Sequence, residues 1–330
     1  MKLAILDDYQ HVALAAADWS RLERRGVGIT VFHEPFASVE DAAKRLAPFD
    51  ALCLMRERTA FPRALVERLP NLKFVSLTGL RAGTLDSKAL GERGIPVSNT
   101  RGGSSTGLTA ELCWGLIIMA ARGLAQGERN MRSGRWHESI PRGFALEGKR
   151  LGLMGLGKIG ARVGAIGKAF GMQVQAWSQN LTPEKAAEAG ARHVSKEELV
   201  ATSDVLSLHL VLSDRTRGIV GRHDLERMKA GAVLVNVSRG PLVDEAALLD
   251  GLRKGRPAHA ALDVYDREPL PADHPLRSME NVTLSPHLGY VNDENLRTFH
   301  EDSVENVEAW LSGKPVRVMN AEFLQGQPLK

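Results

Sequence analysis

The stretch from Leu151 to Gly160, Leu-Gly-Leu-Met-Gly-Leu-Gly-Lys-Ile-Gly, limits most strongly what this chain can fold into. An apolar run leads into Gly155, Gly157 and Gly160, which stand at the G-x-G-x-x-G spacing, and an amphipathic run follows. This order predicts a strand, a tight turn and a helix: Gly155 permits the turn, Gly157 admits a pyrophosphate to the backbone, and Gly160 lets the helix pack closely on the strand. Because the first amides of a helix are unpaired and its dipole is positive there, the pattern favours a bound dinucleotide.

The rest of the chain alternates short apolar runs with amphipathic runs, and this alternation predicts parallel sheets covered by helices on both faces. With 330 residues the chain is longer than one compact core usually holds, so two domains are expected. Strands are expected near residues 3–6, 29–32, 51–55, 74–77 and 94–97 in a first α/β unit, and near 151–154, 174–177, 205–210, 233–237, 260–264 and 282–284 in a second.

Helices are expected near residues 13–24, 39–46, 64–69, 182–190, 244–255 and 292–311, with a further long helix that ends near residue 122. Residues 131–148 show no clear period and are expected to be rich in loops. The last helix could fold back onto the first unit and make that domain discontinuous. The expected fold class is α/β, with two parallel-sheet domains of the Rossmann-like or flavodoxin-like kind.

The composition argues against several classes of function. Hydrophobic residues make up 43% of the chain and charged residues 25%, as in an ordinary globular protein. The formal net charge is +4, Lys and Arg are scattered and aromatic residues reach only 5%, so nucleic-acid binding is not expected. Cys53 and Cys113 lie in apolar runs and indicate buried thiols of a reducing compartment rather than a disulfide or a metal site. No signal peptide or membrane-spanning run is apparent, so a cytoplasmic protein is expected.

Three charged residues follow strands of the second unit, at the edge where parallel sheets bind their ligands. Arg239 follows the strand expected at 233–237, Glu268 the one at 260–264, and His287 the one at 282–284. A guanidinium can bind a carboxylate and polarise the carbonyl beside it. A histidine titrates near neutral pH and can donate a proton to that oxygen, while a carboxylate behind the imidazole orients it and favours its charged form. Together they suit the chemistry of 2-oxo acids.

Several motifs of the chain resemble those of a known family. The motifs that carry the resemblance are Gly155–Gly160, Leu234–Asp244, Leu262–Leu270 and Ser285–Gly289, supported by Asn99-Thr100 and Thr109-Ala110-Glu111. Their order and spacing are similar to those of the D-isomer-specific 2-hydroxyacid dehydrogenases, and the match covers most of the chain. The resemblance implies that Arg239, Glu268 and His287 are the catalytic residues.

The resemblance also implies a domain plan and a set of contacts. The NAD(P)-binding domain would comprise residues 99–291, and the substrate-binding domain residues 1–98 plus 292–330. Asp263 would bond the carboxamide of the nicotinamide, and the protein would form homodimers through the cofactor domain. The residues expected to contact the cofactor are Thr109, Gly155, Leu156, Gly157, Lys158, Ile159, Gly160, Ser178, Gln179, His209, Val211, Val237, Ser238 and Asp263, and those expected to contact the substrate are Leu80, Arg81, Ala82 and Arg239.

Three departures from the family's pattern affect the details. Ser178 stands at the end of the second strand, where the family's NAD-dependent members carry an acidic residue for the ribose hydroxyls, so NAD and NADP both remain open. Lys185 is the nearest downstream cation for a 2′-phosphate. Arg81 replaces a glycine in a loop that holds the substrate carboxylate in relatives, and either adds a cation that favours acidic or bulky 2-oxo acids or points to solvent. Val211 replaces a common proline.

The predicted function is an NAD(P)-dependent D-2-hydroxyacid dehydrogenase that reversibly transfers hydride between the nicotinamide and a small 2-oxo acid. One alternative is the narrower role of a glyoxylate or hydroxypyruvate reductase. Another is a dinucleotide-sensing interaction protein like the C-terminal-binding-protein corepressors, which retain the same three residues. A peptide-docking groove and regulatory tails would distinguish that class, and the chain is expected to begin and end tightly around its domains.

Overall fold

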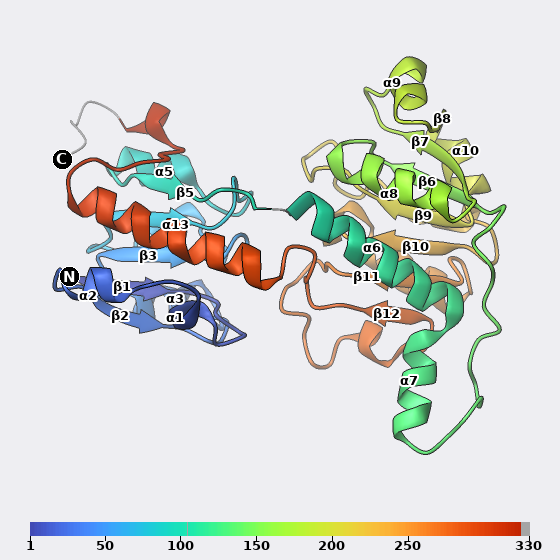
Figure 1. Cartoon of the computed structure of the whole chain (residues 1–330), viewed down its shortest axis with the longest axis horizontal. Helices are drawn as coiled ribbons and strands as arrows, with labels where there is room; N and C mark the ends of the chain where they lie inside the picture. Colours follow the sequence, from blue (N-terminus) through green and yellow to red (C-terminus); the bar gives the residue numbers. More distant parts are fainter. Residues whose placement is uncertain (104, 325–330) are drawn as a thin grey trace. The chain divides into compact units, whose positions relative to one another are not determined.

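The computed structural model describes residues 1–103 and 105–324. The chain divides into two compact units, with boundaries after residue 104 and after residue 290, so the first unit combines both ends of the chain. Each unit contains a parallel sheet flanked by helices (Figure 1). This architecture confirms the predicted α/β class with two parallel-sheet domains, one of them discontinuous.

The first unit holds a five-stranded sheet in the order β2-β1-β3-β4-β5. That order is the flavodoxin-like arrangement of a doubly wound sheet. Its strands are β1 (Lys2–Ile5), β2 (Gly28–Val31), β3 (Ala51–Leu54), β4 (Phe74–Leu77) and β5 (Val97–Asn99), and its helices are α1 (Ala13–Ala16), α2 (Ser20–Glu23), α3 (Val39–Leu46), α4 (Arg63–Val66), α5 (Ser87–Glu92), α13 (Asp293–Leu311) and the 3₁₀ turn η3 (Ala321–Phe323).

Two apolar cores sandwich this sheet. Side chains of α3, α4 and α5 pack on one face, around Leu46, Leu65 and Leu90. Side chains of α1, α2 and α13 pack on the other, where Val304 and Val307 of α13 belong to the core. Figure 1 shows α13 running along its face of the sheet. The C-terminal helix therefore completes the first unit.

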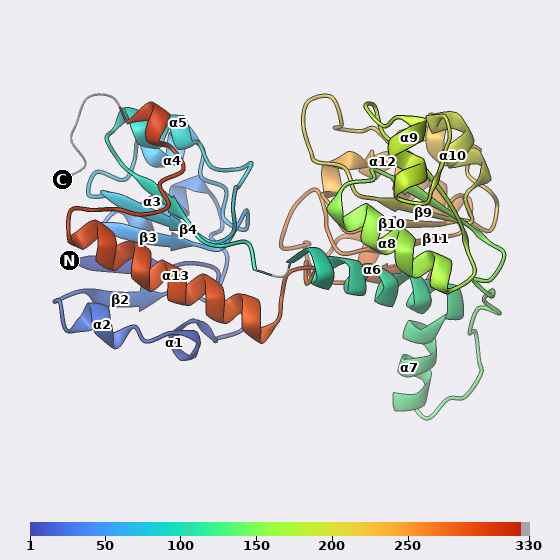
Figure 2. The same ribbon diagram turned by 45° about the horizontal axis from the view of Figure 1, so that its top comes forward.

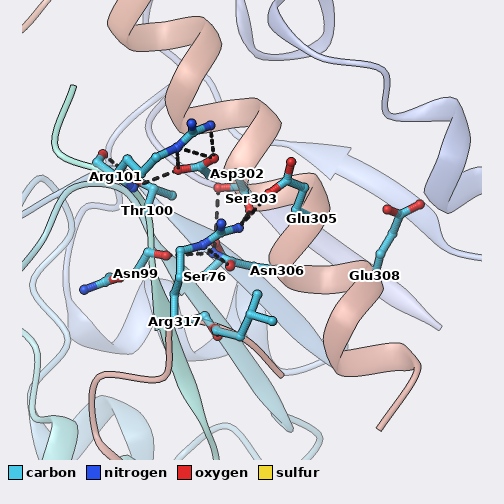
Figure 3. A network of polar contacts seen from close by, with 12 residues as sticks. Ser76, Asn99, Thr100, Arg101, Asp302, Ser303, Glu305, Asn306, Glu308 and Arg317 are labelled. Carbon is cyan, nitrogen blue, oxygen red and sulfur yellow. Dashed lines mark hydrogen bonds and ion pairs between the residues drawn. The ribbon is translucent and has the colours of Figure 1, made fainter. Parts of the chain in front are cut away.

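Polar contacts also fasten α13 to the sheet (Figure 3). Asp302 is fully buried, and its carboxylate accepts hydrogen bonds from the backbone N of Arg101 (2.7 Å), from Nε (3.1 Å) and from Nη2 (2.7 Å). Burial raises the pKa of Asp302, but the bonds from Arg101 outweigh it and hold the pKa below its usual value. Asn306 donates to Ser76 Oγ (3.0 Å) and accepts from Arg317 Nε (3.0 Å). These contacts join α13 to β4 and to the C-terminal segment.

The second unit holds a seven-stranded parallel sheet in the order β12-β11-β10-β9-β6-β7-β8. Its strands are β6 (Arg150–Met154), β7 (Gln173–Trp177), β8 (Arg192–His193), β9 (Val205–Leu208), β10 (Val233–Asn236), β11 (His259–Leu262) and β12 (Val282–Leu284). Its helices are α6 (Ser105–Arg122), α7 (Leu124–Arg132), α8 (Lys158–Ala169), α9 (Pro183–Glu188), α10 (Lys196–Thr202), α11 (Arg222–Arg227) and α12 (Glu245–Arg253), with 3₁₀ turns η1 (Gly240–Leu242) and η2 (Pro275–Ser278).

The strand order reverses at β6, which lies between β7 and β9, and this is the Rossmann arrangement. Apolar side chains of α6 and α8 cover one face of the sheet, and those of α10, α11 and α12 cover the other. Figure 2 shows α6 and α8 on their shared side of the sheet. The strands are almost continuously apolar because both faces are buried.

Among the described residues, no single helix is long and apolar enough to cross a membrane. The bent pair α6 and α7 meets the length and composition criteria only when joined across a 73° bend. Helix α6 itself contributes buried side chains to the core of the second unit.

Three sequence-based expectations differ from the structure. The helix expected at 13–24 is broken into α1 and α2, because Ala17 is extended and Asp18 Oδ1 accepts the amide of Ser20 (3.2 Å). Helix α7 was not among the expected helices, and only its last residues, Met131 and Arg132, enter the segment expected to be loops; it begins after Gly123, whose left-handed conformation ends α6. The first domain was expected to end at residue 98, but Asn99 still pairs with Leu77 in β5.

Candidate active site

Three parallel strands bring the three candidate catalytic segments to one edge of the second sheet. Asn236 at the end of β10 is in register with Leu262 at the end of β11, and Leu262 is in register with Leu284 at the end of β12. The segments that follow these residues carry Arg239, Glu268 and His287. They therefore leave the sheet on the same side, where open α/β sheets bind ligands.

The glycine turn lies at the same edge, where the strand order reverses. Gly155 has φ +105° and its amide donates to Trp177 O (2.8 Å), and a Cβ there would stand 2.7 Å from the carbonyl oxygen of His209. A Cβ at Gly160 would overlap the carbonyl of Gly155. By contrast, a Cβ at Gly157 would meet no atom within 4 Å. Gly155 and Gly160 are thus required by the turn, whereas Gly157 keeps open the space into which a pyrophosphate fits.

Helix α8 begins directly at this turn. Gly157 is its N-cap residue and supplies no side-chain cap. The amides of Lys158, Ile159 and Gly160 precede the first intrahelical bond, which Ala161 donates to Gly157 O (2.9 Å). Unpaired amides and the positive end of the helix dipole favour an anion at this position. The turn and the helix therefore fit the diphosphate of a nicotinamide dinucleotide.

The imidazole and the carboxylate are in direct contact. His287 Nδ1 and Glu268 Oε2 are 2.5 Å apart, and both side chains are mostly buried. The other oxygen of Glu268, Oε1, accepts the backbone amide of Tyr265 (2.9 Å). Because Nδ1 is bonded to Glu268, Nε2 is the ring nitrogen left for a substrate.

The loop that carries His287 is held by a buried carboxylate. Asp263 accepts hydrogen bonds from Ser285 Oγ (2.5 Å), the amide of Leu288 (2.8 Å) and the amide of Gly289 (3.0 Å). Burial raises the pKa of Asp263, and these donors only partly offset it. His287 itself has φ +56°, a left-handed conformation that a non-glycine residue adopts when its surroundings impose it. In this structure Asp263 organises the loop that carries His287, a role that its predicted contact with the carboxamide did not include.

A buried asparagine shapes the turn that carries Arg239. Asn236 Oδ1 accepts the amide of Ser238 (3.1 Å), and its Nδ2 donates to the carbonyl of Arg239 (2.8 Å). The guanidinium of Arg239 donates to Ser238 O (2.6 Å). Sequence reasoning missed Asn236, although its place at the carboxyl end of a strand, three residues before the arginine, was a usable signal.

Other residues expected at the cofactor lie in different environments. Thr109 Oγ1 is 2.7 Å from both Ser105 O and Gly289 O, so its hydroxyl is engaged within the protein. His209 Nε2 contacts Ser207 Oγ (2.9 Å), and burial lowers the pKa of His209 to about 4. Ser238 Oγ donates to Leu208 O (3.0 Å). Val211 is 84% exposed.

The remaining predicted residues fall into four groups. Leu156, Lys158 and Ile159 lie in the glycine turn and the first turn of α8, Ser178 and Gln179 follow β7, and Val237 follows β10. Leu80, Arg81 and Ala82 belong to the first unit, where Leu80 and Arg81 are exposed. Within the described ranges, no group of three or more His, Cys, Asp or Glu side chains could hold a metal ion.

A doubly wound unit with a dinucleotide turn and a paired imidazole and carboxylate fits a nicotinamide-dependent oxidoreductase. Residues 114–289 match the family model described as "D-isomer specific 2-hydroxyacid dehydrogenase, NAD binding domain". The chain belongs to the D-isomer specific 2-hydroxyacid dehydrogenase family, and it acts on the CH–OH group of 2-hydroxy acids.

Relatives support this membership over nearly the whole chain. A glyoxylate reductase of Aeropyrum pernix is 39% identical over 79% of this chain and 80% of its own length. A hydroxypyruvate reductase of Blautia hydrogenotrophica is 32% identical over 97% of this chain and 100% of its own. The crystal structure of a putative D-3-phosphoglycerate dehydrogenase from Ralstonia solanacearum is 37% identical, with a TM-score of 0.91 over 99% of this chain and 98% of its own.

Proposed function

We propose that Arg239, Glu268 and His287 form the catalytic site of this chain, which reduces a small 2-oxo acid to the D-2-hydroxy acid and runs the reverse reaction. The observation that carries the proposal is the 2.5 Å contact between His287 Nδ1 and Glu268 Oε2. It stands at the sheet edge that also carries the glycine turn. An imidazole braced in this way presents Nε2 in a defined direction.

Each of the three side chains has a different role in the proposed reaction. The nicotinamide, when bound, supplies the hydride that adds to C2 of the 2-oxo acid. The Arg239 guanidinium binds the substrate carboxylate and stabilises negative charge on the C2 oxygen. His287 Nε2 donates a proton to that oxygen, and Glu268 holds the ring and stabilises its charged form. In the reverse direction His287 accepts the hydroxyl proton.

The domain roles follow from the same proposal. The second unit, residues 105–290, serves as the NAD(P)-binding domain, and the first unit, which combines both ends of the chain, serves as the substrate-binding domain. The backbone around Leu80, Arg81 and Ala82 contributes to substrate binding, and Arg81 adds a cation that favours acidic 2-oxo acids. If Arg81→Ala has the same rates across mono- and dicarboxylates, Arg81 has no such role.

We propose that the chain accepts both NADH and NADPH. Residues 178–180, Ser-Gln-Asn, follow β7 and carry no carboxylate that would repel a 2′-phosphate. A titration followed by tryptophan fluorescence measures the Kd of each cofactor without any turnover. Failure of NADPH to bind would refute the assignment of Ser178 as permissive.

The substrate class is proposed to include glyoxylate and hydroxypyruvate, on the support of relatives with those names that match over 80% and 100% of their own length. A panel of 2-oxo acids, assayed with NADH and with NADPH, tests it. His287→Gln is expected to lower kcat by about 10²- to 10⁴-fold. The matched control is His223→Gln on α11, where the side chain is exposed. A kcat for His287→Gln within about twofold of the parent would overturn the mechanism.

We also propose that the protein forms a homodimer and is located in the cytoplasm. Leu124, Met131 and Trp136, on α7 and the segment after it, are 49%, 59% and 64% exposed, and a second copy would cover them. Both cysteines are buried free thiols, which suits a reducing compartment. Sedimentation of Trp136→Ser as a monomer beside a dimeric parent would support the interface, and a monomeric parent would refute it.

A further inference from the structure

We propose that Tyr265 is a positioning residue that sets the mutual geometry of all three catalytic segments, an inference that rests on the function proposed above. Tyr265 lies between Asp263 and Glu268 in the segment after β11, and its side chain is 7% exposed. Each part of the residue contacts a different catalytic segment.

The amide of Tyr265 fixes the carboxylate. It donates to Glu268 Oε1 (2.9 Å), while Glu268 Oε2 contacts His287 Nδ1 (2.5 Å). With one oxygen held by the backbone, the other is presented to the imidazole in a single orientation. The direction of the His287 ring therefore depends on where the Tyr265 backbone stands.

The hydroxyl of Tyr265 reaches the loop of the histidine. It lies 2.9 Å from Ser285 O and 3.1 Å from Leu262 O, and its one proton is shared between these two acceptors. Leu262 O also accepts a hydrogen bond from the amide of Ser285 (2.8 Å). Loss of the Tyr265 hydroxyl would therefore leave Leu262 O with a donor, and its main effect would be on the carbonyl of Ser285. That carbonyl stands two residues before His287. Burial raises the pKa of the Tyr265 hydroxyl further above its ordinary value near 10, so the hydroxyl keeps its proton at working pH.

The peptide that follows Tyr265 packs on the arginine turn. A Cβ at Gly240 would overlap the carbonyl group of Tyr265 and the amide nitrogen of Asp266. Gly240 directly follows Arg239, so only a glycine lets the two backbones approach this closely. One residue thus touches the segments of Glu268, His287 and Arg239. A phenylalanine would retain the amide and peptide contacts but lose the hydroxyl bonds.

The test is Tyr265→Phe, with Tyr9→Phe as the matched control. Tyr9 lies in the first unit, and its hydroxyl donates to Asp7 Oδ1 (3.0 Å), so the control also loses one side-chain hydrogen bond. A misplacement of about 1 Å at a reacting group lowers rates by roughly 10²-fold. We expect kcat of Tyr265→Phe to fall by about 10- to 100-fold with a changed pH profile of kcat/KM. The Kd of NADH, measured by fluorescence, should stay within about twofold.

A double-mutant cycle separates positioning from a general loss of structure. In the Glu268→Gln background, Tyr265→Phe should change kcat by less than about twofold, because both substitutions act through the same pair of side chains. Multiplicative effects, or a cofactor Kd raised more than about tenfold, would overturn the positioning role. If Tyr265→Phe is fully active while His287→Gln is inactive, the inference fails and the proposed function stands. If both variants are fully active, the proposed function fails as well.

Discussion

Replacing Gly157 with alanine is expected to weaken dinucleotide binding strongly without disturbing the fold. Gly157 has φ −79° and ψ −163°, an extended conformation that alanine adopts readily, and a Cβ there meets no atom within 4 Å. The free energy of unfolding should therefore change by no more than about 0.5 kcal/mol. The added methyl group would project into the open space beside the first amides of α8, where the pyrophosphate is expected.

The size of the expected loss of cofactor affinity follows from the hydrogen bonds that the methyl group prevents. A hydrogen bond between a backbone amide and a charged oxygen contributes about 1.5–3 kcal/mol. Holding the phosphate away from two amides, such as those of Lys158 and Ile159, removes about 3–6 kcal/mol. Each 1.4 kcal/mol corresponds to about a tenfold change, so the Kd should rise by roughly two to four orders of magnitude.

The assay is a fluorescence titration with NADH and with NADPH, paired with urea unfolding of the same samples. Gly115→Ala in α6 is the matched control, because a Cβ at Gly115 also meets nothing within 4 Å. In a helix interior this change should stabilise the fold by about 1 kcal/mol and leave the Kd unaltered. Gly160→Ala should impair both folding and binding, since its Cβ overlaps the carbonyl of Gly155. A Gly157→Ala protein that binds NADH within about threefold of the parent would refute the reasoning.

Three further outcomes are expected. Arg101→Ala removes the guanidinium from the fully buried Asp302 (Figure 3) and should destabilise the first unit more than Asp302→Asn does, because it leaves the carboxylate charged and without its ion partner. Equal losses in urea unfolding and in hydrogen exchange of α13 would contradict this. Burial lowers the pKa of His300 from 6.5 to about 4, so the unfolded chain binds a proton at a higher pH than the folded chain does. The free energy of unfolding should therefore fall by at most about 1.4 kcal/mol per pH unit as the pH drops from 6.5 to 4. His300→Leu should flatten this part of the measured stability profile, and an unchanged slope would count against the prediction. Asn236→Ala removes the two side-chain hydrogen bonds that hold the turn of Arg239, and it should raise the KM for the 2-oxo acid by about tenfold at an unchanged NADH Kd. An unchanged KM in steady-state kinetics would show that Asn236 is dispensable.

The sequence determined those features whose causes are local. The spacing of Gly155, Gly157 and Gly160 predicted a strand, turn and helix, because φ values and close approach are set by the residue itself. Alternating apolar runs predicted two parallel sheets, because a strand buried on both faces has to be apolar throughout. The pairing of Glu268 with His287 was also expected, because the ends of neighbouring parallel strands share one edge.

Tertiary structure decided the features that depend on partners far apart in the chain. No local signal shows that Thr109 contacts Gly289, that Asp263 holds the histidine loop, or that Tyr265 reaches three segments. The break between α1 and α2 likewise accompanies the packing of Trp19, whose indole donates to Ala13 O (2.7 Å). A hydroxyl or carboxylate bonds whichever groups the fold brings within 3 Å or so, and sequence spacing does not encode that distance.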